Sequence, residues 1–231
     1  LLGGHCSVLR ALRELRVEGA TLGAMTGCEG YDVEAARRAI PALRQDVHGH
    51  PLVYLDSAST TLKPESVIDA VRHAMALDCA NIHRGVHTLS QRATARFEAA
   101  RARVARHLGG VDPEEVVFVR GTTEGVNLVA QAFGRTAVGA GDEVLVTELE
   151  HHSNLVPWQM LCAERGARLR SIPIDDRGAL RLEQLPTLLG PRTRIVAVSH
   201  MSNSLGTVND VRRVAEAAHA VGATVVVDGA Q

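Results

Sequence analysis

The fold is decided by residues 195–228, whose sequence is IVAVSHMSNSLGTVNDVRRVAEAAHAVGATVVVD. Residues 195–199 form a short apolar run typical of a buried strand, and residues 224–227 form a second run that ends in Asp228. The segment between them places four apolar residues on one helical face, namely Val211, Val214, Ala218 and Val221. Two buried strands joined by a helix are typical of parallel neighbours in one sheet.

The same alternation of strands and helices extends upstream. Short apolar runs predict further strands at residues 116–119, 143–147 and 168–172. Helical patterns predict a helix that follows residues 121–124 and ends near Phe133, and helices at 154–165 and 182–189. This order predicts an α/β fold with a mainly parallel sheet that carries helices on both faces.

Helices without intervening strands are predicted nearer the N-terminus. Asp32 can cap a helix over residues 32–45. Pro64 lies in the first turn of a second helix, whose apolar face is expected to be buried. That face consists of Val67, Ile68, Val71 and Met75. A third helix is expected over residues 91–108, where a pair of glycines ends it.

The two ends of the chain are unusual. Residues 1–30 leave room for a short helix at 7–16 but contain no motif, so we expect an extension or linker there. The chain begins with Leu1 and ends with Gln231 directly after a strand-like run, so we expect a fragment. Lys63 is the only lysine, and a mechanism that needs another lysine must find it outside this chain.

Composition excludes several classes of function. The 231 residues include 25 basic and 26 acidic side chains, a net charge of −1, which argues against nucleic acid as a partner. Aromatic residues make up only 3%, too few for a base-stacking surface. No uncharged apolar stretch approaches about 18 residues, so no membrane span is expected. Four widely spaced cysteines predict a reduced, cytoplasmic setting: Cys6, Cys28, Cys79 and Cys162.

Polar side chains follow the predicted strands, where ligands gather in parallel sheets. Residues 121–123, Gly-Thr-Thr, open a helix and suit a phosphate, although a simple helix cap explains them equally well. Asp228 ends a buried strand and suits a protonated ring nitrogen, or it caps the next turn. His151 can lie flat on a planar ring, or it is a structural histidine bonded to the backbone.

A metal site is not expected, although histidines occur in pairs. His83 and His87 are four residues apart but lack the glutamate of the His-Glu-x-x-His zinc motif. His151 and His152 are adjacent, so their side chains point in different directions and chelate one ion poorly.

Six motifs in order resemble the SufS-type (group II) cysteine desulfurases, which belong to the class V aminotransferases. The motifs are YLDSA (54–58), HRGVH (83–87), RGTTEG (120–125), EHHSN (150–154), PWQ (157–159) and DGAQ (228–231). The resemblance covers residues 31–231 and implies the pyridoxal-phosphate-dependent transferase fold type I of aspartate aminotransferase. It also implies that 31–231 hold an N-terminal segment and most of the large cofactor-binding domain.

The resemblance implies roles for matching positions. Thr122 and Thr123 would hold the cofactor phosphate, and His151 would stack on the pyridine ring. Asp228 would pair with the ring nitrogen. The remaining implied contacts are Gln231 with the ring hydroxyl, Asn203 with the cofactor and the substrate carboxylate, and His83 near the mouth of the active site. The implied partners are L-cysteine, a second copy in a homodimer, and a sulfur acceptor of the SufE or SufU kind for iron–sulfur cluster assembly.

The resemblance also implies residues that this chain lacks. The Schiff-base lysine and the persulfide cysteine follow the DGAQ motif in that family, together with a small C-terminal domain. Lys63 and the four cysteines do not match those positions, so we expect this chain alone to be inactive. The alternatives are a non-catalytic truncated partner or pseudoenzyme, a selenocysteine lyase or other class V enzyme, and an unrelated sheet protein with a metal or phosphate ligand.

Overall fold

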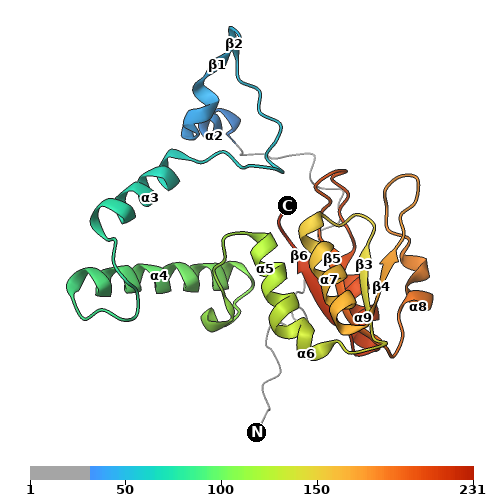
Figure 1. The fold of residues 1–231 in the computed structure, drawn as a ribbon. Helices are drawn as coiled ribbons and strands as arrows, with labels where there is room; N and C mark the ends of the chain where they lie inside the picture. The colour runs from blue at the N-terminus through green and yellow to red at the C-terminus, as the bar shows by residue number, and fades with distance from the viewer. Residues whose placement is uncertain (1–31) are drawn as a thin grey trace. The chain divides into compact units, whose positions relative to one another are not determined.

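The computed structural model describes residues 32–231, and it divides into two compact units at Phe118 and Val119 (Figure 1). The extension or linker expected at residues 1–30, with its short helix, lies outside the described residues. Each unit has its own arrangement of elements, and the polar motifs after the sheet strands belong to the second unit.

The second unit is built on a four-stranded sheet in the order β4-β3-β5-β6. Its strands are β3 (Glu143–Thr147), β4 (Arg168–Ile172), β5 (Thr193–Ser199) and β6 (Thr224–Asp228). All three pairings are parallel, and Ser199 lies opposite Asp228 at the end of β5 and β6. The predicted parallel α/β sheet is therefore confirmed for these four strands.

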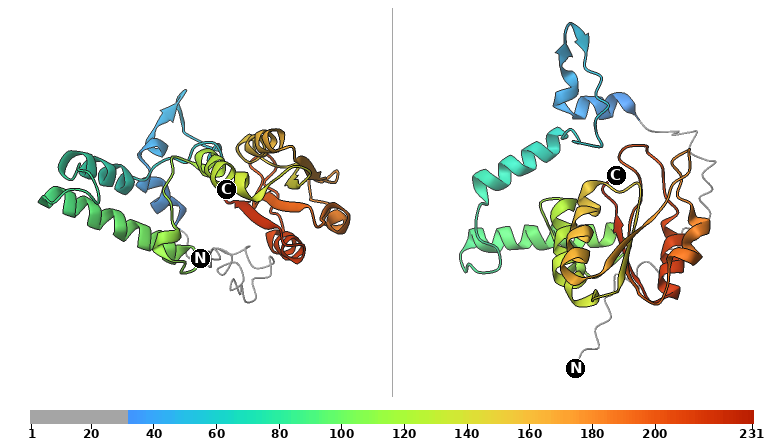
Figure 2. Two further views of the ribbon diagram at one scale, coloured as in Figure 1. Left: turned by 60° about the horizontal axis from the view of Figure 1, so that its bottom comes forward. Right: turned by 45° about the vertical axis from the view of Figure 1, so that its right-hand side comes forward.

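Helices cover both faces of this sheet, as Figure 2 shows. The helical elements are α5 (Thr122–Val129), a π-turn (Ala130–Gly134), α6 (Arg135–Ala137), α7 (Val156–Arg165), α8 (Leu185–Leu188) and α9 (Val211–Ala220), with short 3-10 turns at His152–Asn154 and Leu182–Gln184. The helices agree with the predicted ones, although the helix expected to end near Phe133 continues to Ala137.

Two hydrophobic clusters separate the faces because successive side chains of a strand point to opposite sides. Val144 and Val146 of β3 belong to the first cluster, which α5 and α7 complete through buried residues that include Trp158. Leu145, between them, belongs to the second cluster, which α8 and α9 complete through residues that include Val214. Within residues 32–231, both clusters are therefore formed by residues that follow Val119.

The prediction of a strand at residues 116–119 is wrong. These residues form no ladder with any strand among residues 32–231. Val117 and Phe118 are 64% and 46% exposed, which is far from the buried environment that the apolar run suggested. An apolar run supplies a strand with side chains for a core, but the strand itself exists only when a neighbour accepts its hydrogen bonds.

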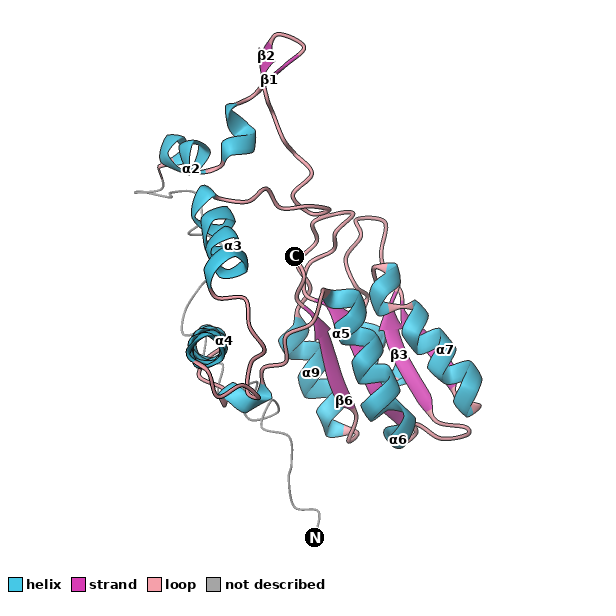
Figure 3. Cartoon of the chain, turned by 60° about the vertical axis from the view of Figure 1, so that its left-hand side comes forward, coloured by secondary structure: helices cyan, strands magenta, loops and turns pink. Residues whose placement is uncertain are grey.

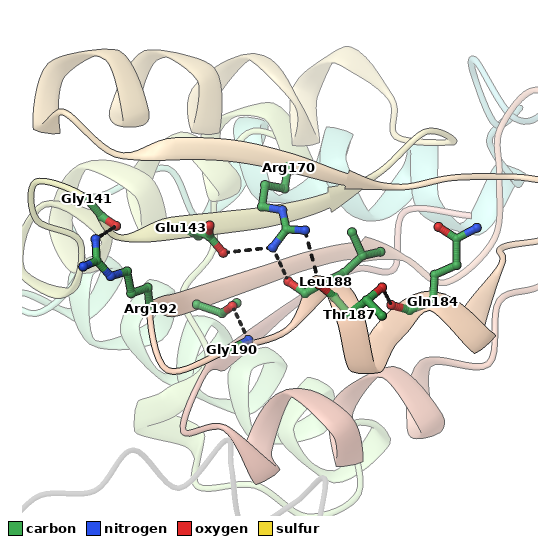
Figure 4. Close-up of polar contacts among 9 residues, drawn as sticks. Gly141, Glu143, Arg170, Gln184, Thr187, Leu188, Gly190 and Arg192 are labelled. Carbon is green, nitrogen blue, oxygen red and sulfur yellow. Dashed lines mark hydrogen bonds and ion pairs between the residues drawn. The ribbon is translucent and has the colours of Figure 1, made fainter.

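Arg170 on β4 holds the edge strand to the end of α8 (Figure 4). Its guanidinium donates to the carbonyl oxygens of Leu188, at 2.8 Å, and Thr187, at 3.4 Å, and it lies 3.2 Å from a carboxylate oxygen of Glu143. A cation at the C-terminal end of a helix satisfies carbonyl groups that the helix itself leaves without donors.

Replacing Arg170 with methionine is expected to lower the free energy of unfolding by about 1–3 kcal/mol, because a partly buried carboxylate and two carbonyls lose their donor. Urea unfolding measures the change. Arg168→Met is the matched control, since Arg168 is exposed on the same strand. Equal effects of the two substitutions would show that the contacts of Arg170 add no stability.

The first unit is mainly helical (Figure 3). Its elements are α2 (Val33–Ala39), a 3-10 turn (Pro41–Arg44), a hairpin of β1 (Asp46–Val47) and β2 (His50–Pro51), α3 (Glu65–Leu77), α4 (Thr88–His107) and a 3-10 turn (Pro113–Glu115). The buried Asp78 carboxylate lies 3.1 Å from Arg92 and 2.7 Å from Arg96, and so ties the end of α3 to α4.

Two predictions for this unit need correction. Asp32 caps α2 as predicted, accepting from the Ala35 N–H at 2.8 Å, but the helix ends at Ala39 rather than continuing to residue 45. Pro41 explains this break, because the residue before a proline is excluded from helical geometry. The apolar face of α3 forms as a helix but is not buried: its four residues, Val67, Ile68, Val71 and Met75, are 44–73% exposed.

Candidate functional site

The carboxyl ends of β3, β5 and β6 lie at one edge of the sheet because the strands are parallel and hydrogen-bonded to each other. The chain segments that leave this edge carry His151 after β3, Asn203 after β5, and Asp228 with Gln231 at and after the end of β6. Helix α5, which begins with Thr122 and Thr123, contacts the turn His152–Asn154. Four predicted site residues therefore lie at or after strand ends at this edge, and Thr122 and Thr123 begin a helix that contacts the turn after His151.

Asp228 is 7% exposed at the end of β6. One carboxylate oxygen accepts a hydrogen bond from the Ala230 N–H at 2.9 Å, and its carbonyl accepts from the His200 N–H at 2.8 Å. The carboxylate therefore does cap the following turn, as the simpler interpretation held. Its other oxygen has no hydrogen-bond donor among residues 32–231, so it can still accept one from a ligand.

His151 begins the 3-10 turn and is exposed. Its Nδ1 accepts from the Ser153 N–H at 3.2 Å and lies 2.8 Å from the Ser153 hydroxyl. A ring nitrogen that accepts from a backbone N–H carries no proton in the neutral form, so Nε2 carries it. The rings of His151 and His152 are 6.0 Å apart and inclined by 66°, and do not converge on one point.

The first turn of α5 is open to a ligand. Gly121 precedes it and no side chain caps it among residues 32–231. Glu124 accepts instead from the N–H of Arg120 at 2.6 Å and pairs with its guanidinium, whose hydrogen bond is the main cause that lowers the pKa of Glu124. The leading N–H groups and the hydroxyls of Thr122 and Thr123 therefore stay available to an anion at the positive end of the helix.

Asn203 and Gln231 are both exposed, and Asn203 lies in the loop that follows β5. Ser202 shapes that loop, because its hydroxyl accepts from the N–H groups of Ser204 and Leu205 at 3.3 and 3.2 Å. Buried Asn209 closes the loop by donating to the Ser199 carbonyl at 2.8 Å. The loop is therefore anchored at its base, with Asn203 free of those anchoring bonds.

His83 belongs to the first unit. Its Nε2 lies 2.7 Å from Glu98, its ring meets Phe97 edge-on, and its backbone has a φ of 63°. The structure therefore gives His83 a partner within its own unit.

Glu150 is a site residue that the sequence pattern did not single out. Its carboxylate accepts from the Thr147 hydroxyl, the Ser199 N–H and the Asn154 amide, at 2.7, 2.9 and 2.6 Å. Burial is the main cause that raises the pKa of Glu150; these three donors lower it, and the charge of Asp228 raises it further. A signal did exist in the sequence: Glu150, Asn154 and Trp158 are spaced four residues apart.

The described part of the chain holds neither a metal-binding group of side chains nor a membrane-spanning helix, and its two cysteines differ in burial. Among residues 32–231, no group of three or more His, Cys, Asp or Glu side chains is arranged to hold a metal ion. No helix in the same range is long and apolar enough to span a bilayer. Cys162 is packed in α7, as expected, and burial raises the pKa of its thiol, whereas Cys79 is exposed. Cys6 and Cys28 lie outside the described residues.

Comparisons with known proteins agree with this arrangement. Residues 53–231 match the family model for aminotransferase class-V. Cysteine desulfurases of Dickeya dadantii and Klebsiella pneumoniae are 52% identical over 203 and 201 residues, which are 88% and 87% of this chain but 49% and 50% of those proteins. The chain thus spans about half the length of the curated relatives it matches.

Solved structures show the same relationship. The cysteine desulfurase CsdA of Escherichia coli is 42% identical with a TM-score of 0.77, over 87% of this chain and 49% of that one. The apo cysteine desulfurase of Thermococcus onnurineus is 37% identical with a TM-score of 0.78, over 86% and 48%. These matches exclude the alternative of an unrelated sheet protein and confirm the expected fold type I. The chain belongs to the class-V aminotransferase family.

Proposed function

We propose that this chain forms the cofactor-binding part of a pyridoxal 5'-phosphate-dependent cysteine desulfurase. One observation carries the proposal: the buried Asp228 carboxylate lies at the same sheet edge as His151, whose turn contacts α5. Family membership and the similarity to cysteine desulfurases support it. The division into an N-terminal segment and most of a large cofactor-binding domain remains part of the proposal.

The residues at this edge fit the cofactor. The free oxygen of Asp228 can accept from a protonated pyridine nitrogen, and a buried carboxylate favours a positive charge beside it. The open first turn of α5, with Thr122 and Thr123, suits the phosphate. The exposed ring of His151 can pack flat on the pyridine. When bound, the cofactor supplies an electron sink that stabilises negative charge on the substrate.

The protein's own residues bind and orient in this mechanism. Asp228 would hold the proton on the ring nitrogen, and this keeps the ring electron-withdrawing. Gln231 would hydrogen-bond the ring hydroxyl, and Asn203 would bond the cofactor and the substrate carboxylate. His83 is proposed to lie near the substrate entrance, partly through a second copy of the chain.

The proposed reaction takes the sulfur of L-cysteine. The carbon–sulfur bond breaks, the sulfur joins the thiolate of a catalytic cysteine as a persulfide, and L-alanine leaves. We propose that the enzyme is of the SufS type, acts as a homodimer in the cytoplasm, and passes sulfur to an acceptor of the SufE or SufU kind for iron–sulfur cluster assembly.

The test uses the full-length protein. We expect saturable binding of pyridoxal phosphate, measured by its absorbance, and release of alanine from L-cysteine with sulfur retained on the protein. Absence of saturable binding would overturn the cofactor assignment. Turnover of selenocysteine without turnover of cysteine would overturn the substrate assignment in favour of a selenocysteine lyase.

Replacing both Thr122 and Thr123 with valine is expected to weaken pyridoxal phosphate binding about 10- to 100-fold, because hydrogen bonds to a charged group contribute about 1.5–3 kcal/mol. Equilibrium titration measures the affinity. Thr136→Val is the control, since its exposed hydroxyl bonds only the Phe133 carbonyl. Unchanged affinity in the double variant would place the phosphate elsewhere.

A further inference from the structure

Among residues 32–231, the three groups that hydrogen-bond to the Glu150 carboxylate are all donors. The backbone N–H of Ser199 is a donor only, and it donates to Oε1 of Glu150 at 2.9 Å. The Thr147 hydroxyl accepts from the Leu149 N–H at 3.1 Å and donates its own hydrogen to the same oxygen at 2.7 Å. The side-chain amide of Asn154 donates to Oε2 at 2.6 Å.

Trp158 fixes the orientation of the Asn154 amide. The indole Nε1 is a donor only, and it donates to the Asn154 oxygen at 3.0 Å. Trp158 and Asn154 are both 0% exposed, so water cannot replace either partner. The amide therefore turns its NH₂ group towards Glu150. Position 150 must accept at both oxygens, which a carboxylate does and a carboxamide does not.

These bonds join the parts of the site. Glu150 directly precedes His151, and Ser199 pairs with Asp228 in the register of β5 and β6. The carboxylate thus spans from the segment that carries His151 to the strand pair that carries Asp228. Burial of a carboxylate costs free energy, and the three donors that reach both of its oxygens offset part of that cost.

We propose that Glu150 is a positioning residue, which sets the place of His151 relative to Asp228 through the ordered hydrogen bonds Trp158–Asn154–Glu150–Ser199. The benefit to the cofactor rests on the function proposed above. The hydrogen-bond order itself does not, because it is a property of the protein alone.

The proposal can be tested by moving the negative charge from position 150 to position 154. In Glu150→Gln the new NH₂ group faces the NH₂ group of Asn154, and turning Asn154 only moves the conflict to Trp158. Adding Asn154→Asp removes the conflict, because the amide introduced at position 150 then donates to the carboxylate introduced at position 154. That amide still accepts from Thr147 and Ser199 through its oxygen, and the new carboxylate still accepts from Trp158.

Glu148→Gln is the matched control for this pair of substitutions. Glu148 is exposed in the same segment, and its replacement can still accept from the Ile174 N–H. The control therefore removes the same charge without creating a conflict between donors.

Two measurements are made on the full-length variants, urea unfolding without cofactor and titration with pyridoxal phosphate. We expect E150Q to lower the urea midpoint by about 1 M and the affinity about 10- to 100-fold, with a changed circular dichroism of the bound cofactor. E150Q/N154D should recover most of each change, and E148Q should match the parent protein.

The outcomes separate the two proposals. If E150Q matches the parent, or if E150Q/N154D recovers neither the urea midpoint nor the affinity that E150Q loses, the positioning role is wrong. If E150Q fails to fold while the double variant folds, the role is supported, and if neither folds it is overturned. If the parent protein binds no pyridoxal phosphate, the proposed function fails, while recovery of the urea midpoint still decides the hydrogen-bond order.

Discussion

Replacing Asp228 with alanine is expected to weaken pyridoxal phosphate binding to the full-length protein by about 150- to 5,000-fold. Loss of one member of a buried charged pair costs about 3–5 kcal/mol, because the other charge is left without compensation. Asp228 is 7% exposed, so water has little access to compensate for the lost carboxylate. Titration of the cofactor by absorbance measures the affinity.

The effect on turnover is expected to exceed the effect on binding. In the proposed function, Asp228 would hold the proton on the ring nitrogen, so its loss is expected to lower alanine release even at saturating cofactor. Asp228→Asn keeps an oxygen that can accept from the Ala230 N–H but removes the charge, so it separates the effect of the charge from that of the side chain's shape. Asp176→Asn, on an exposed turn, is the control. Full turnover in D228A would exclude Asp228 from the cofactor site.

The second large effect is expected from Trp158→Ala, which should lower the free energy of unfolding by about 3–5 kcal/mol. Trp158 is 0% exposed between α7 and the sheet, and its loss leaves a cavity and the Asn154 oxygen without a donor. Urea unfolding measures the change. Trp158→Phe fills most of the volume and isolates the loss of the hydrogen bond, about 1 kcal/mol.

Met160→Ala serves as the control for Trp158, because Met160 is 59% exposed on the same helix. A cost for W158A no larger than that for M160A would mean that α7 does not depend on the indole. W158F should also loosen the orientation of Asn154, which links this prediction to the role of Glu150.

Local patterns predicted the strands of the sheet because each is decided by its own side chains. The runs at β3 and β5 are apolar and largely buried, and the helices between the strands supply that burial, whereas β4, with Arg168 and Arg170, is a partly exposed edge strand. The break after α2 could also have been predicted from the sequence, since Pro41 disfavours continuation of the helix that Asp32 begins.

Features that depend on distant partners were missed. Residues 116–119 have the side chains of a strand but no neighbour to pair with among residues 32–231. The apolar face of α3 likewise predicts burial, but the helix pattern does not show which segment would pack against it, and the face is exposed. Glu150 was overlooked because one of its donors, Ser199, is 49 residues away, and only folding of β5 beside β3 brings it near.

The strand order has a consequence for the chain segments that leave the carboxyl ends of β3 and β5. The connection from β3 through α7 steps outward to β4, while the connections through α8 and α9 step in the reverse direction along the other face. Since crossovers between parallel strands are right-handed, this reversal sends the segments after β3 and β5 away from each other. Beyond the Glu150–Ser199 hydrogen bond, each segment can therefore change in length without displacing the other, while the four strands between the two hydrophobic clusters stay in place.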